Sequence, residues 1–248
     1  ENGHFFIRQT FTLSNINVLS KLEDDLLILS NDLNAEFFLS DIQSSMNTIM
    51  LVSKFDHCLN DILYRVRNNS LNLNIKAIVS NHKIAEEIAN FSKIPFYYFP
   101  VDKSNKEKQE LKIKDLIIKN DVEMIVLARY MQVLSEEFTN EFEGKIINIH
   151  HSFLPSFKGA KPYHQAFERG VKVIGATAHY VTSDLDEGPI IEQDTQVVDH
   201  EMMPNNLVSM GRDIESRVLY RALKAHSERR VFLNGNRTVV FKGHRILG

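Results

Sequence analysis

The sequence is poor in cysteine and has no segment suited to crossing a membrane. It contains one cysteine, Cys58, and no tryptophan among its 248 residues. A single cysteine excludes an internal disulfide and is typical of a reducing compartment. No stretch approaches the ~18 consecutive apolar residues that a membrane span requires, and the N-terminus has none of the features of a signal peptide. We therefore expect a cytoplasmic protein with no membrane partner.

The charge balance argues against nucleic acids as partners. The chain has 29 Lys and Arg against 32 Asp and Glu, a net charge of −3, without a long basic run. Proteins that bind nucleic acids usually carry clustered basic residues, because they must neutralise phosphates. We therefore expect no nucleic-acid partner. The hydrophobic fraction of 43% is ample for a core, and the length suits one large domain or two modest ones.

The N-terminal segment predicts a strand, a helix and a second strand, over residues 3–12, 15–34 and 35–42. The first stretch is apolar and partly alternating, and the second carries leucines at helical spacing. So short a piece buries little surface by itself. Unpaired strand edges invite association, so we predict a homo-oligomer. We expect its interfaces to involve these strands and, as a second candidate, a C-terminal hairpin at residues 230–241.

From residue 47 onward, strand-like and helix-like patterns alternate. The predicted strands are followed by helical patterns, and the strands read as continuous apolar runs, which is typical of a parallel sheet covered on both faces. Asn81 is a candidate helix cap. The sequence therefore predicts an α/β fold with a mostly parallel, doubly wound sheet. The predicted strands are 48–53, 75–80, 95–100 and 123–128, and the predicted helices are 57–67, 82–92, 103–120 and 204–229.

Residues 145–191 hold the densest group of polar side chains suited to chemistry. A strand over 145–149 runs into Asn148 and His150, a second strand covers 173–181, and an acidic turn containing Asp186 follows. Side chains two apart on a strand point to the same face. An amide, an imidazole and a carboxylate together suit acyl-type chemistry, in which a carbonyl is polarised and protons are moved.

Other interpretations of these residues remain open at this point. His150 and His151 are adjacent, so on a strand they face opposite ways and only one serves the site. A single histidine or aspartate is more often structural than catalytic. Metal binding is the main chemical competitor, because His164 and His179 are also present. The chain has neither an HExxH motif nor paired cysteines, so we expect no metal.

Two further observations bear on the reaction class. Cys58 follows His57 directly, but adjacency in sequence is not the geometry of an activated thiol, and a buried structural cysteine is the better interpretation. The first predicted strand of the sheet leads into Lys54-Phe55-Asp56. A glycine-rich loop that cradles phosphate is therefore missing at this place.

The central motifs resemble those of the folate-dependent formyltransferases and, within that Rossmann-like group, of the formyltetrahydrofolate deformylase family. The resemblance covers about residues 46–243. It rests on Asn148–Gly159 (NIHHSFLPSFKG), Gly175–Tyr180 (GATAHY), Leu185–Pro189 (LDEGP), Gly159–His164 (GAKPYH), Val52–Leu59 (VSKFDHCL), Gly211–Glu215 (GRDIE) and Asn236–Val240 (NRTVV).

This resemblance implies a reaction and a set of site residues. The reaction is hydrolysis of 10-formyltetrahydrofolate to tetrahydrofolate and formate, which supplies formate for purine synthesis and balances one-carbon pools. The folate is the substrate, and no further cofactor is implied. The implied catalytic residues are Asn148, His150 and Asp186, and the implied folate-binding residues are Met131, Val133, Leu134, His179, Thr182 and Asp184.

The resemblance also implies a domain division and leaves alternatives. Residues 1–45 match the second half of an ACT-like α+β regulatory module, and residues 46–248 match the catalytic domain with its long C-terminal helix and hairpin. One alternative is a transferase that formylates glycinamide ribonucleotide or another amine. A second is an inactive regulator that binds folate or an amino acid. The missing phosphate loop favours water as acceptor, and the intact polar trio favours an enzyme.

Overall fold

The structure, a computed structural model, describes residues 3–13, 15–102, 104–155 and 162–243. Its internal contacts divide the chain into two compact units, Glu1–Ser44 and Ser45–Gly248. Within the described parts, every helix falls short of the length and hydrophobicity that a membrane crossing needs.

The N-terminal unit is built around one helix. A short 3-10 helix, η1 (Ile16–Val18), leads into α1 (Leu19–Leu33), which ends at Asn34 in the left-handed conformation. The predicted helix is confirmed, but the predicted strands at 3–12 and 35–42 are wrong, because the described residues there are irregular. A strand needs a neighbour to complete its backbone hydrogen bonds, and this unit offers none among its described residues. Large apolar side chains are exposed on it, namely Phe5, Ile7, Phe11, Leu27, Ile28, Leu29, Leu33, Phe37 and Phe38.

The second unit contains a seven-stranded sheet in the order β3-β2-β1-β4-β5-β6-β7. The first five strands of that order are parallel, whereas β6 runs antiparallel to β5 and β7 antiparallel to β6. The mostly parallel, doubly wound sheet predicted from the sequence is thus confirmed. The strands are β1 (Met46–Val52), β2 (Leu73–Ser80), β3 (Phe96–Tyr98), β4 (Met124–Leu127), β5 (Ile146–His150), β6 (Val173–Tyr180) and β7 (Ile190–Val197).

The helices fall close to their predicted positions, with one correction at a helix start. Asn81 does not cap the second helical segment: its side-chain oxygen accepts a hydrogen bond from Ser53 Oγ at 2.7 Å. The segment begins instead after His82 with the 3-10 helix η2 (Lys83–Ala85). The α-helices are α2 (His57–Arg67), α3 (Glu86–Phe91), α4 (Lys106–Lys119), α5 (Glu136–Glu141), α6 (Pro162–Glu168) and α7 (Pro204–Ser227), and the predicted hairpin is β8 (Val231–Asn234) with β9 (Arg237–Val240).

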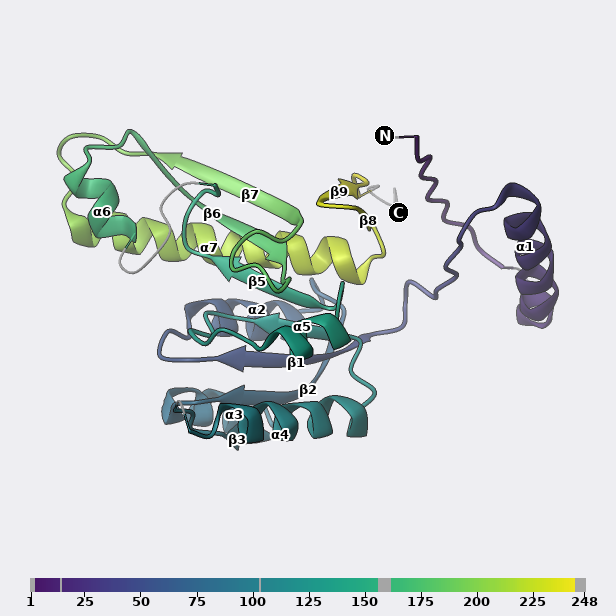
Figure 1. The fold of residues 1–248 in the computed structure, drawn as a ribbon, viewed down its shortest axis with the longest axis horizontal. Helices are drawn as coiled ribbons and strands as arrows, with labels where there is room; N and C mark the ends of the chain where they lie inside the picture. The colour runs from purple at the N-terminus through teal and green to yellow at the C-terminus, as the bar shows by residue number, and fades with distance from the viewer. Residues whose placement is uncertain (1–2, 14, 103, 156–161, 244–248) are drawn as a thin grey trace. The chain divides into compact units, whose positions relative to one another are not determined.

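Two apolar cores cover the two faces of the sheet. In β1, Met50 and Val52 join one core and Ile49 and Leu51 join the other, because successive strand side chains point to opposite faces. The first core also contains side chains of α2, α3 and α7, and the second contains those of α4 and α5. Figure 1 shows α7 running along β6 and β7, with which it is in contact. This layering leaves the ends of β4 and β5 to form a site.

A polar contact joins β6 to α7. Tyr180 Oη lies 2.7 Å from His226 Nδ1, and the two rings meet edge to face. Burial, followed by the charge of Arg229, lowers the pKa of His226 to about 4. The ring is therefore neutral at physiological pH, and its Nδ1 accepts a hydrogen bond from the Tyr180 hydroxyl.

This contact predicts a pH dependence of stability. The folded-state pKa of His226 lies below the ordinary 6.5, at about 4, so the unfolded chain binds the proton more tightly. The contribution of the neutral His226 to the stability of the folded state is present above pH 6.5 and is lost as the pH falls toward 4. The loss is as much as roughly 2 kcal/mol, allowing for partial exposure of the ring. His226→Gln keeps a partner for Tyr180 but does not titrate.

Urea unfolding at pH 7 and pH 4.5 measures this effect. We expect the free energy of unfolding of His226→Gln to fall less between the two pH values than that of the native chain. His200→Gln, which alters an exposed histidine, is the control and should follow the native chain. An equal fall for His226→Gln and the native chain would contradict the assignment.

Candidate active site

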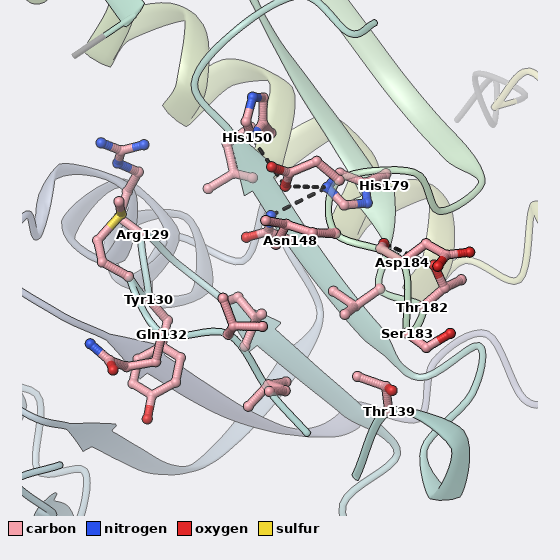
Figure 2. Close-up of a pocket in the computed structure, with 18 of the residues that line it drawn as sticks. Arg129, Tyr130, Gln132, Thr139, Asn148, His150, His179, Thr182, Ser183 and Asp184 are labelled. Carbon is pink, nitrogen blue, oxygen red and sulfur yellow. Dashed lines mark hydrogen bonds and ion pairs between the residues drawn. The ribbon is translucent and has the colours of Figure 1, made fainter. Parts of the chain in front are cut away.

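A cavity of about 240 Å³ lies where β4 and β5 end. Its walls are the loop 129–134 after β4, the end of β5, and the turn 181–186 after β6. Figure 2 shows Asn148, His150 and His179 between the two loops. Ligand sites of open α/β sheets occur at the carboxyl ends of the strands, so the position fits the fold.

The loop 129–134 is fixed by hydrogen bonds to neighbouring elements. The Met131 N–H donates to Ser53 Oγ at the end of β1, at 3.0 Å. The Ser135 N–H donates to Glu110 Oε1 on α4, at 2.9 Å. These bonds at either end of the loop place it over the cavity.

The predicted catalytic residues come together. Asn148 and His150 project from β5, and Asp186 Oδ1 lies 3.1 Å from His150 Nδ1. Burial alone would raise the pKa of Asp186, but the hydrogen bond and charge of His150 outweigh it, so the pKa is lowered. Asp186 is therefore a carboxylate that accepts a hydrogen bond from His150. This pair fixes which edge of the imidazole faces the carboxylate.

The turn that carries Asp186 adopts a backbone conformation that few residue types tolerate. Asp186 itself adopts a positive φ of 58°, a conformation rarely used by non-glycine residues. Two residues on, a Cβ at Gly188 would lie 1.8 Å from the Tyr180 carbonyl oxygen. Only glycine allows this approach. The Tyr180 N–H donates to the Pro189 carbonyl oxygen at 2.9 Å, which holds the end of the turn against β6.

His179 orients the amide of Asn148. The His179 Nδ1–H donates to the Tyr180 carbonyl oxygen at 2.8 Å, because a carbonyl is only an acceptor. Burial lowers the pKa of His179, so the ring is neutral and its Nε2 is an acceptor. The Asn148 Nδ2 group lies 3.2 Å from this atom and donates to it. The second N–H of the amide is not used by this bond.

His151 lies in the same cavity as His150, so the expectation that they face opposite ways is wrong. Both histidines line the cavity, and their ring centroids are 5.0 Å apart. The reason is that β5 ends at His150 and the chain bends at the next residue. Strand alternation therefore does not extend to His151, and the site has two adjacent imidazoles.

A second polar network lies beside the cavity around Glu215 of α7, which is 1% exposed. Its carboxylate accepts hydrogen bonds from His57 Nε2 at 2.8 Å and from Tyr163 Oη at 2.7 Å. Arg129 Nε forms an ion pair with it at 3.3 Å. Burial acts to raise the pKa of Glu215, but these partners outweigh it, so the pKa is lowered. Gly211 makes room, since a Cβ there would lie 2.1 Å from Tyr163 Cζ.

Three described side chains of this region have potential metal-ligand atoms close together. The atoms belong to His57, Cys58 and Glu215 and lie within 4.8 Å of one another. However, burial and the charge of Glu215 raise the pKa of the Cys58 thiol, which disfavours the thiolate that binds metals. The guanidinium of Arg129 also neutralises the carboxylate. The chemistry fits a hydrogen-bonded network better than a metal site, and Cys58 is buried, as expected.

All predicted site residues line the one cavity, although their roles stay predictions. They are Met131, Val133, Leu134, Asn148, His150, His179, Thr182, Asp184 and Asp186. Sequence reasoning missed His151 as a site residue, and it did not foresee the network of Arg129 and Glu215. The signal for Glu215 was its place in the Gly211–Glu215 motif, which by itself assigns no chemistry.

Comparisons with known proteins agree with this geometry. The sequence profile of the formyl transferase family matches residues 46–223, which identifies the class of the fold and its site. The formyltetrahydrofolate deformylase of Corynebacterium sp. (strain P-1) is 45% identical over 97% of this chain and 84% of its own. That of Bacillus subtilis (strain 168) is 43% identical over 97% and 81%. The crystal structure of the Burkholderia mallei deformylase superposes with a TM-score of 0.87 at 47% identity, covering 90% of this chain and 80% of the other. The chain belongs to the formyltetrahydrofolate deformylase family.

Proposed function

We propose that this protein hydrolyses 10-formyltetrahydrofolate to tetrahydrofolate and formate. One observation carries the proposal: Asn148, His150 and Asp186 meet in a cavity at the carboxyl end of the sheet, in a chain of the deformylase family. The reaction supplies formate for purine synthesis and regenerates the unsubstituted folate. The protein is therefore a hydrolase of one-carbon metabolism.

The site stabilises the tetrahedral intermediate that forms when water adds to the formyl carbon. His179 accepts one N–H of the Asn148 amide, and we assign the other N–H to the oxygen that becomes negative. A donor of this kind is worth ~3 kcal/mol of barrier lowering. His150 lies on the same strand, and Asp186 at 3.1 Å stabilises charge that develops on that ring. Asp186 also helps to position the water.

The loops on both sides of the trio hold the folate. Met131 and Val133 line the cavity and are 51% and 58% exposed, so their apolar surface is available to a ligand, and Leu134 lies beside them. On the other side, the Thr182 hydroxyl donates to the Asp184 carbonyl oxygen at 3.2 Å and shapes the turn. Apolar contacts with a few fixed polar groups are the usual environment of a heterocyclic ligand.

The loop after β1 supports water as the acceptor. Phe55 lies there with the guanidinium carbons of Arg129 and Arg212 at 5.5 and 5.9 Å from its ring centroid. Asp56 stands at the start of α2. A phosphate needs free backbone N–H groups and positive potential at such a helix start. The two guanidinium groups supply positive charge, but the loop Ser53–Asp56 has no glycine that would let its backbone cradle a phosphate, and the Asp56 carboxylate repels one. We therefore disfavour a nucleotide acceptor.

The first prediction is that purified protein releases formate from 10-formyltetrahydrofolate without any amine acceptor. Formate and the absorbance change of the folate are followed together, with and without glycinamide ribonucleotide. We expect equal rates, because water is the acceptor. Strict dependence on the nucleotide would make the protein a transferase, and an absence of turnover under both conditions would make it a non-catalytic folate binder.

Replacement of Asp186 by Asn tests the role of the carboxylate. The amide keeps the size of the side chain but cannot offset positive charge on His150. We expect turnover to fall by at least ~100-fold, while the Kd for 10-formyltetrahydrofolate changes by less than about threefold. Asp115→Asn, which alters an exposed aspartate on α4 outside the cavity, is the matched control and should retain turnover. Undiminished turnover of Asp186→Asn would refute the assignment.

We also propose that residues 1–45 are an ACT-like module and that the protein forms a homo-oligomer in the cytoplasm. The exposed Phe5, Phe11, Phe37 and Phe38 of the N-terminal unit support association, and the free, buried Cys58 fits a reducing compartment. The hairpin β8–β9 is a second candidate for the interface. Light scattering should give a mass of at least two chains at micromolar concentration, and a monomer would contradict the proposal.

A further inference from the structure

We propose that His151 is the base that takes the proton from the attacking water. The inference rests on the proposed function, because it concerns the hydrolytic step. Its basis is the arrangement of two imidazoles, His150 and His151, whose ring centroids lie 5.0 Å apart on one wall of the cavity. A hydrolase needs a group for this task more than an amine-formylating enzyme does. A neutral amine attacks with its own lone pair, whereas water, with a pKa of about 15.7, needs a base.

In the other two imidazoles of the cavity, each ring nitrogen is either in contact with another polar group or buried from solvent. His179 uses Nδ1 to donate to the Tyr180 carbonyl oxygen and Nε2 to accept from Asn148. His150 uses Nδ1 for Asp186. Its Nε2 is buried from solvent and has no hydrogen-bond partner within the described residues. Neither ring therefore offers an accessible lone pair to a water in the cavity.

Asp186 is a weaker candidate than His151. Its Oδ1 lies 3.1 Å from His150 Nδ1 and 3.7 Å from His179 Nε2, so the carboxylate is held among imidazoles. Its pKa is lowered, since the hydrogen bond and charge of His150 outweigh the effect of burial. Because its Oδ1 is engaged by these two rings, we assign this carboxylate to orienting the water through a hydrogen bond. We place the proton acceptor elsewhere in the cavity.

The surroundings of His151 keep it neutral and oriented. Its ring meets that of Tyr163 of α6 edge to face, with centroids 6.5 Å apart. The charged and titratable groups around it are Arg129 after β4, His150 on β5, Tyr163 on α6, Asp186 on the turn and Glu215 on α7. Burial, followed by Arg129 and His150, lowers the pKa of His151 to about 4. A neutral imidazole with a lone pair is thus present at physiological pH.

The proton balance of the step is complete without a further reactant. Water oxygen bonds to the formyl carbon, one water proton passes to His151, and the formyl oxygen becomes an oxyanion held by Asn148. The bond from carbon to N10 then breaks. N10 takes the proton from His151, and formic acid leaves and loses its own proton to solvent. His151 ends neutral, as it began.

The test compares His151→Gln with the native chain and with His200→Gln. Glutamine keeps polarity and bulk but takes no proton. We expect kcat to fall by at least ~100-fold, in line with the loss of a general base, with KM within about threefold and an unchanged melting temperature. His200→Gln, at an exposed site, should be indistinguishable from the native chain.

Chemical rescue separates a base from a packing residue. His151→Ala opens space for added imidazole, which should restore at least ~10-fold of the lost rate. The restored rate should rise with the pKa of substituted imidazoles, which a structural role would not produce. A loss of less than threefold in His151→Gln, or a loss in His151→Ala that no imidazole restores, would overturn the inference. If the native chain itself releases no formate, the proposed function fails instead, so the two failures are distinguishable.

Discussion

The position of the Asp186 carboxylate is the constraint on which the rest of the site depends. It is held 3.1 Å from His150 Nδ1 by a turn whose backbone has a positive φ at Asp186 itself. The turn lies against β6 only because residue 188 has no Cβ. On the neighbouring strands, the Tyr180 carbonyl oxygen fixes the tautomer of His179, which fixes the amide of Asn148. Backbone geometry thus determines which polar atoms face the cavity.

Two carboxylates lie near the end of β5, and they have different contacts. Asp186 lies at the cavity and modulates His150, whereas Glu215 is almost fully buried and binds His57, Tyr163 and Arg129. Removing one member of a buried ionic network leaves an uncompensated charge and costs several kcal/mol. The second network therefore favours a single placement of Arg129, whose backbone begins the loop 129–134. Both networks depend on elements that the parallel sheet brings to one edge.

The sequence predicted the fold of the described residues from 46 onward well because its signals are local. Apolar runs and helical spacing identify β1, β2, β4 and α2 closely, and Asn148 and His150 share a face through simple alternation. Two kinds of error have physical causes. The N-terminal strands were expected from apolar pattern alone, yet a strand exists only beside a partner. His151 was placed on the far face because alternation was extended beyond the last residue of β5. The Glu215 network joins residues 158 positions apart, a pairing that a single sequence does not contain.

The central claim is that water, and not an amine, receives the formyl group at this site. Turnover of 10-formyltetrahydrofolate in water enriched in oxygen-18 tests it most directly, with mass spectrometry of the released formate. One solvent oxygen should appear in each formate molecule, because hydrolysis forms one new bond between carbon and water oxygen. Formate that carries no solvent oxygen, or a formyl group recovered on an amine, would contradict the account.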